Sequence, residues 1–209
     1  GGADMGVKWK TVKNEFPKME QSIKSLSGKK VNVGVGVGVL GGGEHVWLAG
    51  IHEYGCTIHA KRGQYLTVPL IPEAVGKKAR GFSDLFVYQS KSGKKFLARS
   101  SKKNSLELVY WLTPSVTIPE RSFLRGGFDE HHKAVLKSID MLIPMLLDGR
   151  VSQQDMFEMV GETLATKIKE YARSLNNPPN SSITKNNKGR NNPLSDSGSM
   201  IESITYEVK

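Results

Sequence analysis

Ser115-Val-Thr-Ile-Pro-Glu-Arg-Ser-Phe-Leu-Arg125 is the stretch in which this chain changes from strand-like to helical patterning. Val116 and Ile118 alternate with Thr117, as expected at the end of a half-buried strand. Pro119 ends that strand, because proline has no N–H for a ladder bond, while its fixed φ is tolerated in the first turn of a helix. The stretch therefore predicts a strand-to-helix elbow.

Charged and aromatic side chains follow the proline. Glu120 suits the positive end of the helix dipole, and Arg121 and Arg125 lie four residues apart, on one face of the expected helix. Phe123 lies toward another face, and we expect it to be buried between strand and helix. Two interpretations of the arginines remain open. They bind carboxylates of an adjacent subunit, or their stems cover the elbow while they pair with nearby carboxylates of the same chain.

Length and composition allow one large domain or two small ones, since the chain has 209 residues with 22 glycines and 9 prolines. No run approaches the roughly 18 apolar residues of a membrane span. No charged-then-apolar signal segment is recognisable, so we expect a soluble cytoplasmic product. The single cysteine, Cys56, excludes an intrachain disulfide. The formal charge of +10 allows an acidic partner without identifying one.

The positive charge is concentrated between residues 61 and 112. Eleven Lys and Arg residues stand there against Glu73, Asp84 and Glu107, so this quarter of the chain carries +8 of the +10. Its strand-like runs are 65–72, 85–88, 95–99 and 106–112, with a turn at 90–93. The region predicts a basic β insertion with charged tips, where we assign partner contacts to Lys94 and Lys95. Because an isolated hairpin is marginal in water, the insertion must lie on the body or on a neighbouring subunit.

Two motifs suggest a ligand but lack the context that the ligand needs. Gly36-x-Gly38-x-x-Gly41 has dinucleotide-binding spacing, yet Gly41-Gly42-Gly43 continues the loop where a helix should begin. His52, Cys56 and His59 form an H-x3-C-x2-H cluster without a fourth ligand for zinc. We therefore expect no cofactor and no metal.

Patterns ahead of the basic region predict a helix, a strand and a second helix. An apolar stripe over 12–26 indicates the first helix, and a terminating glycine follows it. Over 30–40, valines alternate with glycines, and the bare glycine face indicates that another backbone approaches closely. Residues 46–54 indicate the second helix. The residues expected to face inward on it are Val46, Ile51 and Tyr54.

Behind the elbow, the pattern predicts a long helix to about residue 146, with bends at Gly126-Gly127 and Pro144. Ser152-x-x-Asp155 resembles a capping box and begins another helix. A short helix follows from Asp196, whose carboxylate we interpret as an N-cap rather than a catalytic group. A last strand is predicted over 204–208.

Three groups of residues together resemble a known family. They are His52-Glu-Tyr-Gly55, Ile118-Pro-Glu-Arg-Ser-Phe-Leu-Arg125, and Asn177-Pro-Pro-Asn180 continuing through Asn192-Pro-Leu-Ser-Asp-Ser-Gly198 to Ser203-Ile-Thr-Tyr206. In their order and spacing, from about residue 30 onward, they are similar to the neck or tail-completion proteins of tailed bacteriophages, also described as virion-morphogenesis or minor tail components. The chain departs from the family pattern at Glu120, Ser122 and Ser195, where Ala, Pro and Ile are usual.

The resemblance implies a structural virion protein of the head–tail junction or tail, present in the host cytoplasm during assembly, with no catalytic residues. It implies a cyclic homo-oligomer, for which we expect six-fold symmetry, and contacts with head-closure or connector proteins and with tail-terminator or tail-tube proteins, but none with a membrane. We assign the partner contacts at the elbow to Glu120, Arg121 and Arg125. The motif residues with a structural role are Glu53, Tyr54, Gly55, Ile118, Pro119, Phe123, Asp196 and Gly198.

The residues predict an α+β fold in one domain over 1–209, with a small mixed or antiparallel sheet packed with long helices and the basic β insertion at 61–112. Non-specific contact with packaged DNA is a further expectation for the virion protein, and a rival function is a nucleic-acid-binding module that uses this insertion. Its aromatic residues, such as Tyr88, Phe96 and Tyr110, suit strand packing as well as base stacking. No Ser/His/Asp set, phosphate-binding loop or pair of carboxylates points to an enzyme.

Overall fold

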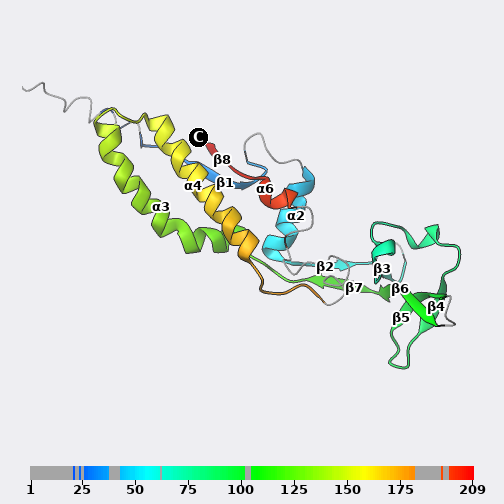
Figure 1. Ribbon diagram of the computed structural model, residues 1–209. Helices are drawn as coiled ribbons and strands as arrows, with labels where there is room; N and C mark the ends of the chain where they lie inside the picture. Colours follow the sequence, from blue (N-terminus) through cyan, green and yellow to red (C-terminus); the bar gives the residue numbers. More distant parts are fainter. Residues whose placement is uncertain are drawn as a thin grey trace, which may run out of the picture.

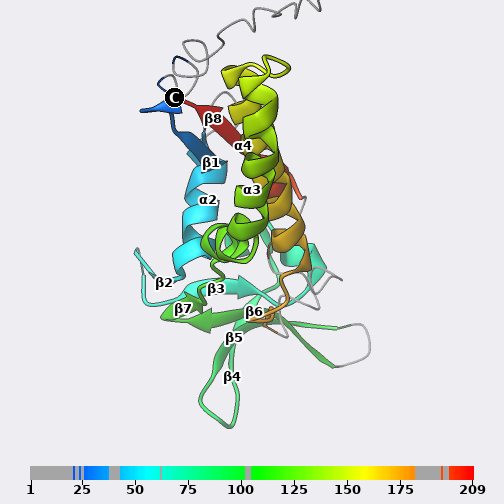
Figure 2. The same ribbon diagram turned by 90° about the vertical axis from the view of Figure 1, so that its left-hand side faces the viewer.

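The computed structural model describes residues 21, 24, 26–37, 43–61, 63–101, 105–181, 194 and 198–209. The fold is α+β, as predicted, with helices and three small antiparallel sheets among these residues. In both views the helices gather at one end of an elongated molecule and a four-stranded sheet lies at the other end (Figures 1 and 2). Most of the predicted helix over 12–26, and Asp196, lie outside the described residues.

The helical body is built on a hairpin of α3 (Phe123–Leu147) and α4 (Gln153–Ser174). Strands β1 (Val31–Val35) and β8 (Ile204–Val208) pair antiparallel and pack on α4, and α2 (Gly43–Tyr54) and α6 (Ser199–Glu202) complete the body. One cluster of buried apolar side chains joins these elements. It includes Phe123, Val160, Leu164, Ile168, Ile201 and Ile204. The side chain of Phe123 is fully buried, which confirms the predicted burial.

The α3–α4 hairpin depends on two features of sequence. Ser152 and Asp155 form the predicted capping box, in which the Ser152 hydroxyl accepts from the Asp155 N–H at 3.1 Å. Gly126 and Gly127 bring α3 close to α4, since a Cβ on Gly127 would lie 3.2 Å from the Ile168 Cα. Pro144 lies inside the same continuous helix. None of the helices that the structure describes is long and apolar enough to cross a membrane.

Two predictions ahead of the insertion are wrong. Strand β1 ends at Val35, where Gly36 adopts a φ of +78°. Among the described residues, a Cβ on Gly34 would meet the Val37 side chain, at 3.4 Å, and no backbone atom within 4 Å, whereas Gly38 of the same predicted glycine face lies outside the described residues. On α2 the buried residues are Ala49 and Glu53. Val46 and Tyr54, which we expected to face inward, are exposed.

The insertion is a four-stranded antiparallel sheet in the order β3-β6-β5-β4. Its strands are β3 (Leu66–Pro69), β4 (Phe86–Gln89), β5 (Lys95–Ser100) and β6 (Leu106–Thr113), which confirms the predicted strands with shifted ends. The turn at 90–93 is also confirmed, because the Gly93 N–H donates to the Ser90 carbonyl at 2.9 Å. Two 3₁₀ turns, Pro72–Ala74 and Ala79–Gly81, cover one face of the sheet and bury Ala74, Val109 and Tyr110. The insertion thus has a small core of its own.

A two-stranded ribbon connects the insertion to the body. Strand β2 (Cys56–His59), which is not predicted from the sequence, pairs antiparallel with β7 (Ser115–Ile118), so the chain enters and leaves the insertion side by side. Within the described ranges, the main contacts of the four insertion strands are with one another, and both views show the insertion projecting from the body (Figures 1 and 2). We expected the insertion to lie either on the body or on a neighbouring subunit. In the structure it does not lie on the body.

Candidate functional site

The elbow between β7 and α3 brings together residues of His52–Gly55, of Ile118–Arg125 and, from the third sequence group, the segment 177–180. Gly55 ends α2, as its position predicts, and turns the chain into β2 with a φ of +67°. A Cβ at this position would lie 2.7 Å from the Glu120 nitrogen and 2.9 Å from the Ile118 carbonyl oxygen. Both the conformation and the lack of space therefore require glycine here.

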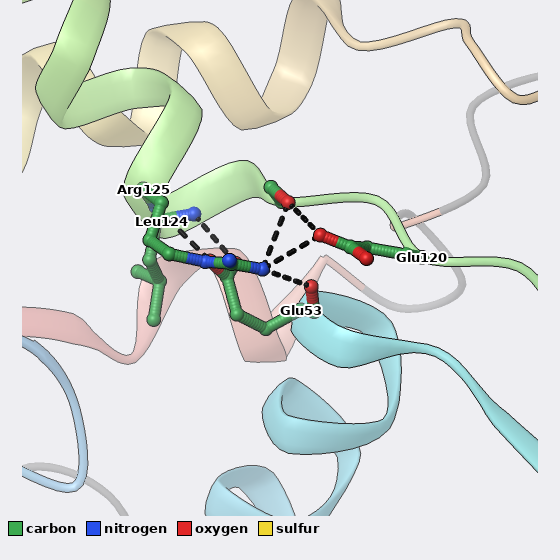
Figure 3. A network of polar contacts seen from close by, with 5 residues as sticks. Glu53, Glu120, Leu124 and Arg125 are labelled. Atoms are coloured by element: carbon green, nitrogen blue, oxygen red, sulfur yellow. Dashed lines mark hydrogen bonds and ion pairs between the residues drawn. The ribbon is translucent and has the colours of Figure 1, made fainter.

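A carboxylate from α2 caps the N-terminus of α3. Glu53 is 3% exposed and accepts from the Leu124 N–H at 2.9 Å and from the Arg125 N–H at 3.1 Å (Figure 3). Ser122, at the N-cap position, makes no capping bond through its side chain. A buried carboxylate satisfies N–H groups that have no partner inside the helix and complements the helix dipole. Glu120 does not have this role, because it precedes the helix by three residues.

Arg125 extends this network from the buried carboxylate to the surface. Its Nε donates to Glu53 Oε1 at 2.8 Å and its Nη2 donates to Glu120 Oε1 at 2.7 Å (Figure 3). Its guanidinium also lies 4.9 Å from the centre of the Tyr54 ring. The bond to Glu53 raises the pKa of Arg125. The Ser122 hydroxyl, and then Arg125, lower the pKa of Glu120. The side chains of Arg125 and Glu120 are both about half exposed, so this ion pair faces solvent.

Arg121 lies before the helix rather than on it, so the prediction that it shares a helical face with Arg125 is wrong. The helix begins at Phe123, where the Glu53 cap fixes its start. Arg121 is 5% exposed, and burial lowers its pKa. Its Nε donates to the Pro178 carbonyl at 3.0 Å. Because this cation is buried against carbonyls of its own chain, it is not available as the predicted partner contact.

These contacts make the elbow a joint between the body and the insertion. Arg121 holds the segment after α4, and its backbone N–H donates to the His52 carbonyl at 2.7 Å. Glu53 holds the start of α3, and Gly55 packs against the end of β7. Both strands of the ribbon therefore leave from residues that are fixed in the body. The elbow sets the direction of the insertion.

The insertion itself carries an apolar face opposite the 3₁₀ turns. Opposed residues of an antiparallel sheet project from the same face, so the registers place one residue from each strand in a single row. The row consists of Val68, Trp111, Phe96 and Tyr88, all half-buried. Phe86 and Leu106, which belong to the same face, are exposed. We call these six residues the uncovered sheet face.

The core of the insertion lies entirely on the other face of its sheet. There the Tyr110 hydroxyl donates to the Lys77 carbonyl at 3.0 Å, and Arg99 pairs with Glu73 at 2.8 Å. None of the residues in the uncovered sheet face belongs to the apolar cluster beneath the 3₁₀ turns. An exposed apolar sheet face of this kind is a candidate interaction surface.

The two predicted lysine contacts separate in the structure. Lys94 lines a shallow hollow on the uncovered sheet face together with Leu70, Phe96 and Trp111. The Lys95 ammonium donates to the Tyr65 hydroxyl at 3.0 Å and lies over its ring. Lys94 is therefore placed to meet a partner of this face, whereas Lys95 is engaged within the insertion.

The remaining predicted positions are the His/Cys cluster and the start of the last helix. Among the residues that the structure describes, no group of three His, Cys, Asp or Glu side chains could hold a metal ion, and His52, Cys56 and His59 form none. Gly198, with a φ of +80°, is the N-cap of α6, so the predicted N-cap at Asp196 is misplaced by two residues. Asp196 itself is not among the described residues.

The uncovered sheet face has a sequence signal that is easy to overlook. Leu106-Glu-Leu-Val-Tyr-Trp-Leu112 is a nearly continuous apolar run rather than an alternating one. Such a run is typical of a strand that is buried on both faces. One face of β6 lies in the core of the insertion, and the other belongs to the uncovered sheet face.

No protein-family model, curated protein or solved structure matches this chain. The resemblance to the neck proteins therefore stays a prediction. Function is inferred from the elbow and from the uncovered sheet face.

Proposed function

We propose that this chain is a structural subunit of a tailed-bacteriophage virion: a ring-forming neck or tail-completion protein that joins connector and tail rings at the head–tail junction. The observation that carries the proposal is the uncovered sheet face. The exposed apolar surface at the end of a projecting insertion is left uncovered in the monomer, and a protein partner that covers it would remove that surface from water. A subunit that self-assembles supplies that partner.

The elbow supports the same function. The described contacts of Glu53, Gly55 and Arg121, which belong to the sequence groups that resemble the neck family, form the joint between body and insertion. An interface repeated around a ring closes only if each subunit holds its two contact surfaces at a fixed angle. The buried Glu53 and Arg121 contacts fix that angle within one chain.

Sedimentation velocity and electron microscopy of the purified chain test this function. We expect a monomer in dilute solution and a discrete, ring-shaped oligomer in concentrated solution. In host cells that make the particle, a tagged copy should purify with it and label the head–tail junction. A chain that stays monomeric when concentrated, and is missing from purified particles, would refute the proposal.

Two neighbouring residues of β4 provide a matched pair of variants for this test. Phe86 belongs to the uncovered sheet face and is 44% exposed, whereas Val87 is 65% exposed on the opposite face. Phe86→Lys should abolish self-association, because it places a charge in the apolar contact. Val87→Lys makes the same chemical change away from the contact, and we expect it to assemble normally.

The aromatic row also favours a second candidate function, the binding of single-stranded nucleic acid. Tyr88, Phe96 and Trp111 lie side by side on a basic insertion, as in a platform for stacking bases. Binding of the phosphates needs cationic side chains beside the stacked bases. Among the described residues that line the hollow on the uncovered sheet face, Lys94 is the only cation. Anisotropy of a labelled single strand distinguishes the two candidates. Tight, salt-dependent binding that Phe96→Ala and Lys94→Ala both remove would favour the nucleic-acid module.

A further inference from the structure

We infer that the uncovered sheet face of one copy docks on an apolar stripe along α3 of a second copy of this chain. This inference rests on the proposed function, because it names the two surfaces that meet in the assembly. The α3 stripe consists of Phe128, Leu136 and Ile143, whose exposed fractions are 47%, 56% and 37%. They are eight and seven residues apart, so they lie on one side of the helix.

The α3 stripe borders a groove between α3 and α4. The groove encloses about 290 Å³ and is lined from both helices by Val135, Ile139, Met156, Phe157 and Val160, with His132 as its polar residue. The His132 ring stacks on Phe128 with centroids 5.4 Å apart, which extends the apolar surface. Stripe and groove together form a continuous apolar surface on the helical hairpin.

The two surfaces are complementary in architecture. A helix that packs its apolar stripe on a sheet face is one of the standard layer arrangements of proteins. Within one molecule they lie at opposite ends, because the elbow and the β2–β7 ribbon hold the sheet away from α3 (Figures 1 and 2). The sheet face of one copy can therefore meet the α3 stripe only on another copy.

Charge favours the same pairing. The insertion carries a net +8 over residues 61–112, whereas residues 128–163 of the helical hairpin contain seven acidic residues against three Lys and Arg. Asp140 is exposed and lies on α3 between Leu136 and Ile143, beside the stripe. Lys94 is exposed at the rim of the sheet face. Opposite charges at the edges of an apolar contact orient it and select the partner.

The contact that results is head-to-tail, because the two surfaces differ. A head-to-tail interface leaves one surface of each kind free after every addition, and it ends when the assembly closes into a ring. This arrangement explains why the chain retains two separate apolar surfaces, instead of the one self-complementary patch of a two-fold dimer.

Disulfide trapping in the full chain tests the contact. In a Cys56→Ser background, which removes the native thiol, Phe86→Cys and Leu136→Cys are prepared as separate proteins, mixed and mildly oxidised. We expect a cross-linked pair that contains one copy of each. Val87→Cys, on the opposite face of β4, replaces Phe86→Cys as the matched control and should give no such product.

Charge reversal provides an independent readout by sedimentation equilibrium. Lys94→Glu and Asp140→Lys should each weaken association by about tenfold or more, and their combination in one chain should restore it. Lys78→Glu, on the covered side of the insertion, and Glu130→Lys, on the opposite side of α3, are the controls. Neither should change the dissociation constant.

The outcomes separate this docking from the proposed function. Rings that form without the cross-link and without the charge rescue would overturn the docking and leave the function standing. A chain that is monomeric throughout would overturn both. If Leu136→Cys is shielded from a thiol reagent in the monomer and becomes reactive when residues 1–26 are removed, the N-terminal segment, which carries the apolar stripe over 12–26, occupies the α3 stripe. That result would also overturn the docking.

Discussion

One carboxylate, that of Glu53, joins two helices that are far apart in the sequence. It accepts from the first N–H groups of α3 and from the Arg125 side chain, while it is itself anchored in the last turn of α2. A ranking of side chains by hydrophobicity places Tyr54 inward and Glu53 outward, and the structure shows the reverse. The reason is that leaving the N–H groups of a buried helix terminus without an acceptor costs more free energy than burying the Tyr54 ring would gain.

Replacement of Glu53 by alanine should destabilise the helical body. The change leaves the N–H groups of Leu124 and Arg125 without their acceptor, and we expect a loss of about 2 to 4 kcal/mol in the free energy of unfolding. Chemical denaturation followed by helical circular dichroism measures it. Glu120→Ala is the control, because it removes a solvent-facing partner of the same arginine and should have a much smaller effect. A loss of unfolding free energy in Glu53→Ala that is no larger than the loss in Glu120→Ala would contradict the capping role of Glu53.

Glu120 should make stability depend on pH at the acid end of the range. Its pKa lies below the ordinary value of 4.5, owing to the Ser122 hydroxyl and Arg125. The folded state therefore favours the ionised form, and the resulting stabilisation is present above pH 4.5 and is lost as the pH falls through the lowered pKa. The melting temperatures of the native chain and Glu120→Gln should differ near neutral pH and converge in acid. A difference that is constant with pH would contradict this assignment.

At the scale of elements, the sequence predicts those whose signals are local. The capping box at Ser152 and the apolar runs of the insertion identify α4 and the strands, because capping and strand periodicity are properties of neighbouring residues. The sequence places the start of α3 in the turn that contains Pro119, but the helix begins at Phe123, because its first N–H groups bond to Glu53, which precedes Leu124 by 71 residues. Arg121 is misassigned for the same reason. Its fixed position depends on the carbonyl of Pro178, which no local pattern reveals.

Strand β2 illustrates the same limit. Three of its four residues, Cys56 to His59, are exposed, so the segment has no buried face and no alternation of apolar residues. It is a strand because it pairs with β7, from Cys56 opposite Ile118 to His59 opposite Ser115. The contacts of the candidate site likewise form between residues that are far apart in the sequence. The sequence groups that resemble the neck proteins indicate which residues converge, but their contacts depend on pairings distant along the chain.

At the scale of the whole molecule, two apolar cores are joined by the ribbon. Among the residues that the structure describes, the core of the body contains none between 61 and 113, and the smaller core of the insertion contains none outside that range. The ribbon therefore connects two parts of the chain that each have an apolar core of their own. The body supplies stability and the α3 stripe, and the insertion supplies the uncovered sheet face.

Removal of the insertion should accordingly leave the body folded but unable to assemble. His59 lies opposite Ser115, and the Ala60 N–H donates to the Pro114 carbonyl at 3.2 Å, so residues 61–113 can be replaced by Asn-Gly, a two-residue hairpin turn. Circular dichroism should show the helical signal and a cooperative melt, because every buried apolar contact of the body is retained. Sedimentation should show a monomer at all concentrations, since the sheet face is gone. A body that no longer melts cooperatively would mean that the insertion is part of one folding unit. Rings that survive the deletion would place the interface on the body alone.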